Sequence, residues 1–229
     1  MDSPYTLRVE REDGELLVLD GLALVRGFLT GDLSARPGGY NQQAGRGDRE
    51  AISLNDIVLV NSTMRSRAEH ARWLPVIQGD QGWLSRIPDA LDILDADDGA
   101  WAAQDGDRLV NEAIAYCIRP YIALARSTKV LHLKRPRAFP VLDNLVIEMM
   151  GAPVPAKLEA RIDVAQQVTA AIRREGRRNI ETLRRIQEAT ATTEVCLSLV
   201  RLFDIALWFS HPAAGVDGAE REITVRLRA

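Results

Sequence analysis

The side chains best suited to chemistry gather in one stretch of the chain, residues 127–151, with the sequence STKVLHLKRPRAFPVLDNLVIEMMG. Basic side chains come first, two prolines bound a short turn, and one carboxylate follows where the next helix should begin. The basic residues are Lys129, His132, Lys134, Arg135 and Arg137, and the carboxylate is Asp143. Such cations bind phosphates, and a carboxylate can stabilise positive charge during bond cleavage. The sequence therefore predicts a binding or catalytic site in this stretch.

Each of these side chains also has a structural interpretation. Asp143 follows a proline-bounded turn, and aspartate is a favoured N-cap residue, so it either takes part in catalysis or caps the next helix. Lys134, Arg135 and Arg137 either contact phosphates or form a solvated basic turn. His132 is a candidate base, although a histidine between apolar neighbours is more often a packed or surface residue.

Two further candidates lie outside this stretch. Tyr40 is in residues 30–49, a glycine-rich segment that we expect to be a long loop, and loops of this length often carry function. Its ring offers stacking to a ligand. Arg201 and Asp204 interrupt the apolar segment 194–209 at a three-residue spacing that places them on one face of a helix. We expect a buried ion pair there, with Asp204 as a secondary candidate for the site.

The composition is that of an ordinary globular protein, with 46% hydrophobic and 27% charged residues. No apolar run approaches the ~18 residues of a membrane span, and the N-terminus lacks a secretory signal pattern. These features predict a cytoplasmic protein. Cys117 and Cys196 could form a disulfide, but two buried reduced thiols are the expected state. They are not spaced to bind a metal with the three histidines. We therefore predict no metal and no cofactor.

Charge is distributed unevenly along the chain. Residues 1–120 contain 12 basic and 20 acidic side chains, whereas residues 121–229 contain 17 basic and 12 acidic ones. A basic half favours an anionic partner, but two oppositely charged surfaces can equally attract each other. The pI of about 5.7 differs from the values above about 9 that are typical of nucleic-acid-binding domains.

The hydrophobic pattern predicts one mainly α domain over residues 1–229, with about seven to nine helices. Residues 7–11 and 15–19 alternate as a β hairpin does, and residues 222–227 have the same period and are expected to add a third strand. The helical part is expected to span residues 21–210, with residues 219–229 as a strand or tail. A long helix should open at Pro155 and stop at Gly176, and the apolar segment 194–209 should form a central helix.

Two resemblances follow from these segments. The sequence TKVLHLKRPRAFPVLDNLV is similar to a run of the form SKLLxRKRPxLxPxYD in an uncharacterised bacterial domain-of-unknown-function family. SLNDIVLVN and LVRLFDIALW fit the early and late helices of that family. Residues 121–148 also resemble the hairpin-plus-acid segment of helix-hairpin-helix DNA glycosylases, the endonuclease III superfamily. In that alignment Asp143 matches the glycosylase aspartate, whereas Tyr121-Ile122-Ala123 replaces the glycine turn and Ala125 the lyase lysine.

The glycosylase resemblance implies a helix-hairpin-helix architecture and a monofunctional, metal-free hydrolase. It would act on or bind a nucleobase, a nucleoside or DNA, with Asp143 stabilising an oxocarbenium-like transition state. The residues expected to hold substrate or phosphate are Lys129, His132, Lys134, Arg135, Arg137 and Tyr40. Two alternatives remain: a non-catalytic nucleic-acid-binding or interaction module on the same scaffold, and a small-molecule enzyme of specialised metabolism. The sequence does not indicate an oligomeric state.

Overall fold

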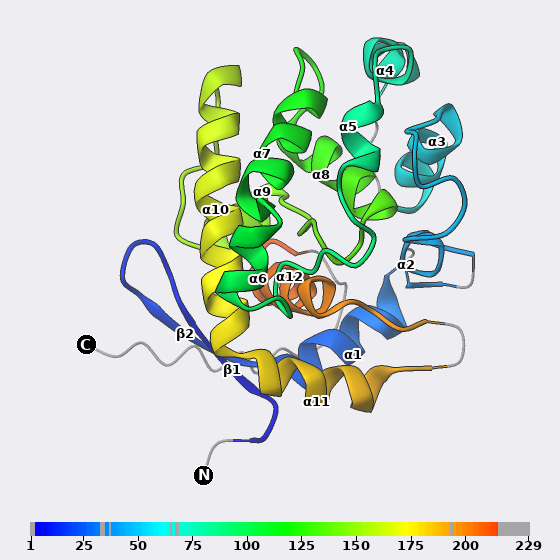
Figure 1. Ribbon diagram of the computed structural model, residues 1–229. Coiled ribbons are helices and arrows are strands. Elements are labelled where there is room, and N and C mark those ends of the chain that lie inside the picture. The colour runs from blue at the N-terminus through cyan, green and yellow to red at the C-terminus, as the bar shows by residue number, and fades with distance from the viewer. Residues whose placement is uncertain are drawn as a thin grey trace.

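The protein is mainly helical, as the sequence predicts, with a small β hairpin at its N-terminal end (Figure 1). A computed structural model describes residues 3–32, 35–36, 38–64, 66, 69–192 and 195–214. These residues contain twelve helices, more than expected, because several are too short for hydrophobic periodicity to reveal. In chain order the helices are α1 (Gly21–Gly31), α2 (Tyr40–Gln43), α3 (Leu54–Thr63), α4 (His70–Ile77), α5 (Gly82–Ser85), α6 (Asp98–Ala103), α7 (Gly106–Cys117), α8 (Leu124–Lys134), α9 (Asn144–Met149), α10 (Leu158–Arg178), α11 (Ile180–Thr190) and α12 (Leu199–Ser210).

Helix α12 lies in the middle of the fold and packs against α1, α9, α10 and α11 (Figure 1). All of its residues except Trp208 are buried, which confirms the prediction of a central apolar helix. It begins at Leu199 rather than at residue 194, because the Ser198 hydroxyl accepts a hydrogen bond from the Arg201 N–H and so caps the helix. The same hydroxyl donates to the Pro136 carbonyl at 2.6 Å, which ties the helix start to the proline turn.

The hairpin consists of β1 (Thr6–Glu10) and β2 (Leu16–Asp20), which pair antiparallel with Thr6 opposite Asp20. Gly14 in the turn has a φ of +85°, a conformation that favours glycine. The outer edge of β1 is not left open: the Asn179 side chain accepts from the Arg8 N–H and donates to the Arg8 carbonyl, at 2.9 and 2.8 Å. The end of α10 therefore covers the strand edge.

The third strand expected at residues 222–227 lies outside the described residues. Within them, the sheet has two strands. None of the helices in the same ranges combines the length and the apolarity needed to cross a bilayer.

Gly176 does not end the long helix, contrary to the sequence-based expectation. Helix α10 begins at Leu158, after Pro155, and continues through Gly176 to Arg178. A Cβ atom on Gly176 would lie 2.6 Å from Leu94 Cδ2 and 2.8 Å from Leu94 Cδ1. Any side chain at position 176 would therefore force Leu94 to move, because Leu94 packs directly on the helix backbone.

Replacing Gly176 with Ala should lower the free energy of unfolding by about 1–2 kcal/mol. Alanine favours the helix by up to about 1 kcal/mol over glycine, but overpacking at Leu94 costs about 1–3 kcal/mol. Urea denaturation of the variant measures the difference. A second variant, Gly176→Ala with Leu94→Ala, removes the clash, and a single variant as stable as the wild type would show that Leu94 has room to move.

Candidate functional site

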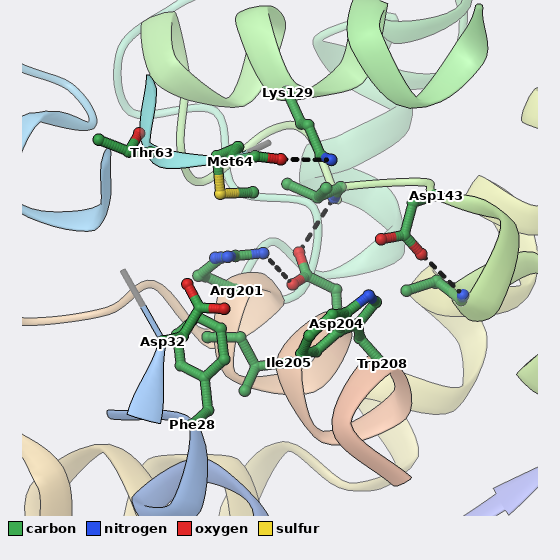
Figure 2. A pocket seen from close by; sticks show the side chains of 12 residues that line it. Phe28, Asp32, Thr63, Met64, Lys129, Asp143, Arg201, Asp204, Ile205 and Trp208 are labelled. Carbon is green, nitrogen blue, oxygen red and sulfur yellow. Dashed lines mark hydrogen bonds and ion pairs between the residues drawn. The ribbon is translucent and has the colours of Figure 1, made fainter. Parts of the chain in front are cut away.

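Asp143 lines a pocket of about 230 Å³ between α8, α1, α9 and α12 (Figure 2). We call it the Asp143 pocket. Its apolar wall includes side chains from α1 and α12, and its charged groups come from α8, α12, the start of α9 and the end of α1. The residues that line it are Phe28, Asp32, Thr63, Met64, Lys129, Val141, Asp143, Val146, Arg201, Asp204, Ile205 and Trp208.

Asp143 both caps α9 and faces this pocket. One carboxylate oxygen accepts from the Val146 N–H at 3.1 Å, which confirms the predicted N-cap. Figure 2 shows the other oxygen directed toward the side of the pocket where Lys129 and Arg201 lie. Burial raises the pKa of the Asp143 carboxyl, whereas Lys129 and the backbone amides favour its ionised form. The cap and the site roles that the sequence left open are therefore compatible.

Lys129 reaches the same pocket from α8. Its ammonium group donates to the Met64 carbonyl at 3.3 Å, and among the described residues no carboxylate lies within ion-pair distance of it. Burial lowers the pKa of Lys129, and the charge of Asp143 partly opposes that effect. A cation and a carboxylate thus line one pocket without neutralising each other by direct contact.

Asp204 and Arg201 form the buried ion pair that their spacing predicts. The second Asp204 oxygen accepts from the Val141 N–H at 3.0 Å, and the Arg201 Nε donates to the Asn41 side chain at 2.9 Å. Burial raises the pKa of Asp204 to about 7, against the opposing effect of Arg201. The pair also fixes the chain at Val141, two residues before Asp143, so it positions the candidate carboxylate.

Tyr40 and His132 are core residues rather than parts of the Asp143 pocket. Tyr40 is fully buried on the short helix α2, inside the segment that we expected to be loop, and its hydroxyl donates to the Lys129 carbonyl at 2.6 Å. Its ring stacks on the His132 ring with centroids 5.8 Å apart. Tyr40 therefore anchors the glycine-rich segment to the helix that carries Lys129.

Lys134 and Arg135 are buried and form hydrogen bonds and ion pairs with other protein groups. They therefore do not form the solvated basic turn that was one interpretation of the sequence. Lys134 Nζ lies 2.7 Å from both Asp56 Oδ2 and the Asp48 carbonyl. Arg135 donates to the carbonyls of Ile87 and Leu84 at 2.9 and 3.1 Å and forms further contacts with acidic side chains. Both cations hold the segments that precede α3 and follow α5 against the proline turn.

Replacing Lys134 with Met should lower the free energy of unfolding by about 2–3 kcal/mol. Removing one partner of a buried pair costs about 3–5 kcal/mol, and the loss is smaller here because Asp56 keeps its hydrogen bonds from the Ser53 amide and hydroxyl. Lys157→Met, at an exposed lysine, is the matched control. Equal denaturation midpoints for the two variants would contradict the structural role.

Arg137 lies in a second cavity, of about 420 Å³, which we call the Arg137 pocket. Asp92 holds it there through an ion pair of 2.9 Å to the guanidinium Nε. The residues that line this pocket are Asn41, Ala44, Asp92, Asp95, His132, Pro136, Arg137, Arg184, Gln187, Cys196, Leu197, Ser198, Leu199 and Arg201.

Cys196 is exposed rather than buried as expected, whereas Cys117 is a buried thiol. Burial raises the pKa of Cys117 to about 12.

The structure thus divides the predicted site residues into three groups. Lys129, Asp143 and Asp204 meet in the Asp143 pocket, His132 and Arg137 line the other pocket, and the remaining ones are structural. Sequence reasoning missed the apolar wall of the Asp143 pocket, including Phe28 and Trp208. Trp208 follows Asp204 by four residues, so helical spacing could have placed it on the same face. Phe28 comes from α1, and nothing in its local sequence points to this contact.

Residues 39–211 match the model of a family of unknown function, DUF6308. The chain belongs to this family. The match includes every charged residue of the Asp143 pocket except Asp32, and it confirms the prediction of an uncharacterised family. No curated protein and no solved structure matches the chain. The likeness to helix-hairpin-helix glycosylases therefore stays a prediction.

In the ranges that the structure describes, no group of three or more His, Cys, Asp or Glu side chains is arranged to hold a metal ion. The charged residues of the Asp143 pocket are instead two cations and three carboxylates. Their arrangement suits a small organic ligand with both donor and acceptor groups.

Proposed function

We propose that the protein binds a small nucleoside-like molecule in the Asp143 pocket and hydrolyses its N-glycosidic bond. The observation that carries this proposal is the Asp143 carboxylate, fixed by the start of α9, with one oxygen directed into a largely apolar pocket. Breaking an N-glycosidic bond develops positive charge on the sugar. A carboxylate held beside that charge, in a site with little water, stabilises it.

The pocket walls support a small planar ligand. Trp208 and Phe28 supply aromatic surface, and Met64 adds a polarisable side chain. The volume of about 230 Å³ is below the about 300–1,000 Å³ of pockets that take drug-sized ligands. A ligand of the size of one base with its sugar, partly open to solvent, is in keeping with this volume.

Lys129 gives the reaction a second polar group. In the proposed hydrolysis water adds its oxygen to the sugar carbon and loses one proton. The base leaves with the bonding electron pair and takes up one proton, so the OH of water ends on the sugar and its H on the base. The Lys129 ammonium, with one backbone acceptor at 3.3 Å, can donate a hydrogen bond to the departing base. Asp143 must be ionised to act, and since burial raises its pKa, the rate should fall as the pH drops through that raised value.

The burial of Lys134 and Arg135 in the basic turn favours a free nucleoside over duplex DNA as substrate. Lys134 and Arg135 are each only 2% exposed and bonded to protein groups. Exposed cations are what phosphate backbones bind, so two of the expected phosphate contacts are already occupied within the fold. We expect no strongly salt-dependent binding of duplex DNA.

A binding module without chemistry is the second candidate, favoured by the cap that Asp143 provides for α9. In that case the same pocket holds a base or nucleoside, and Asp143 serves stability alone. The two candidates differ in whether the carboxylate charge matters once the ligand is bound.

Asp143→Asn tests this difference. Base release from a panel of purine and pyrimidine nucleosides should fall by about 100- to 1,000-fold, while the melting temperature changes little because Asn is as good an N-cap as Asp. Asp143→Ser, another capping residue without charge, is the matched control and should be equally inactive. Nucleoside binding by calorimetry without any base release from the wild type would favour the binding module, and neither binding nor release would overturn both.

A further inference from the structure

We propose that the Arg137 pocket binds a small anion that also carries a hydroxyl group, such as a polyol phosphate or a hydroxy acid. Two uncommitted groups carry the inference: the terminal nitrogens of Arg137 and the ε nitrogen of His132, which line the same cavity. This inference does not depend on the proposed chemistry in the Asp143 pocket.

The Nε atom of Arg137 is hydrogen-bonded within the protein, which leaves its two terminal nitrogens available to a ligand. Its Nε donates to Asp92 Oδ2 at 2.9 Å. Asp92 is itself buried, and its other oxygen accepts from the Leu94 and Asp95 amides, both at 2.9 Å. In the part of the chain that the structure describes, neither terminal nitrogen of Arg137 has a protein acceptor. A guanidinium fork positioned in this way matches the two oxygens of a carboxylate or phosphate.

His132 presents an acceptor to the same space. Its Nδ1 lies 2.6 Å from the Phe139 carbonyl, which can only accept, so Nδ1 carries the proton. Burial lowers the pKa of the ring to about 3, and His132 is therefore neutral with a lone pair on Nε2. Among the described residues no donor reaches this nitrogen. His132 lines the pocket, so a ligand hydroxyl in the pocket can donate a hydrogen bond to Nε2.

The other polar groups of the pocket are largely committed. The Ser198 hydroxyl donates to the Pro136 carbonyl, and the Gln187 amide donates to the Leu197 carbonyl, each at 2.6 Å. Both terminal nitrogens of Arg184 pair with carboxylates, those of Asp95 and Glu181. The groups available to a ligand are thus Arg137, which can bind an anion, and His132, which can accept a hydrogen bond from a ligand hydroxyl. The volume of about 420 Å³ is within the range of about 300–1,000 Å³ known for small-molecule sites.

The test uses full-length protein labelled with ¹⁵N-histidine, since the chain has only three histidines to resolve. Four probes are titrated: glycerol 3-phosphate, glycerate, inorganic phosphate and glycerol. The two hydroxylated anions should shift the His132 Nε2 signal in a saturable way. Inorganic phosphate should bind with little change at Nε2, and glycerol should cause none. The tighter of the two hydroxylated anions assigns the pocket to phosphate esters or to carboxylates.

Arg137→Gln should weaken binding of the hydroxylated anions at least about tenfold, since hydrogen bonds to a charged group are lost. Arg86→Gln, at an exposed arginine outside the pocket, is the matched control. Arg137→Lys keeps the charge without the fork and replaces the first variant if that one fails to fold. An unmoved His132 Nε2 signal with all four probes, or equal affinity in the Arg137 variant, would overturn the proposal. Asp143→Asn should bind the probes normally, which separates this result from the proposed hydrolysis.

Discussion

Asp204→Leu is expected to lower the free energy of unfolding by about 3–5 kcal/mol. Leucine carries no charge and accepts no hydrogen bond, so the Arg201 guanidinium, only 4% exposed, loses its carboxylate. The Val141 N–H also loses its acceptor. An uncompensated buried cation is the dominant cost, and the ring faces of Phe28 and Tyr40, 5.5 and 5.7 Å from the guanidinium carbon, offset only part of it.

Urea denaturation of three variants separates charge from packing. Asp204→Leu should be the least stable, Asp204→Asn should lose less because its amide oxygen can still accept from Val141, and Asp204→Leu with Arg201→Met should recover most of the loss. Replacing both members of a buried pair by apolar groups is often neutral or stabilising. A single Leu variant as stable as the wild type, or a double variant less stable than the single one, would contradict the pairing.

The second large effect expected is a loss of stability in acid that originates at His132. The pKa of this buried histidine is lowered to about 3, from an ordinary value of 6.5. Between these values the unfolded chain binds a proton that the folded protein does not, so stability falls as the pH falls, and the full effect is reached at about pH 3. The difference corresponds to about 5 kcal/mol at most.

His132→Gln should flatten this part of the stability curve, whereas His70→Gln, at an exposed histidine, should leave it unchanged. The comparison between variants is needed because Asp143 and Asp204 act in the opposite direction. Their pKa values are raised, so their contribution to stability declines as the pH rises toward those values. Parallel curves for wild type and His132→Gln from about pH 6.5 to about pH 4 would show that the histidine is not the origin.

Local signals predicted much of the fold. The hairpin at residues 7–19, the cap at Asp143 and the central apolar helix all depend on residues within a few positions of one another. The expected helix stop at Gly176 was wrong. The glycine makes room for the side chain of Leu94, which is more than eighty residues away in the sequence. No local pattern contains that contact.

The site was predicted in part for the same reason. Lys129, Asp143 and Asp204 were identified by type and spacing, since a lone carboxylate after a proline turn and a charged pair in an apolar helix are visible in the sequence. Lys134 and Arg137 look alike in sequence, yet one is buried against Asp56 and the other is half-exposed beside Asp92. Whether a basic side chain is buried in an ion pair or stays partly exposed depends on acidic partners that lie 45 or more residues earlier in the sequence.

Arg201 contributes to the lining of both pockets. Its guanidinium is gripped by Asp204 on one side and by Asn41 on the other. If two ligands each contacted this guanidinium, binding of one would affect binding of the other. A shift of the guanidinium toward the first ligand would change its electrostatic interaction with the second. By thermodynamic reciprocity each would change the affinity of its counterpart by the same factor. A single side chain on the central helix would thus couple the two proposed binding sites.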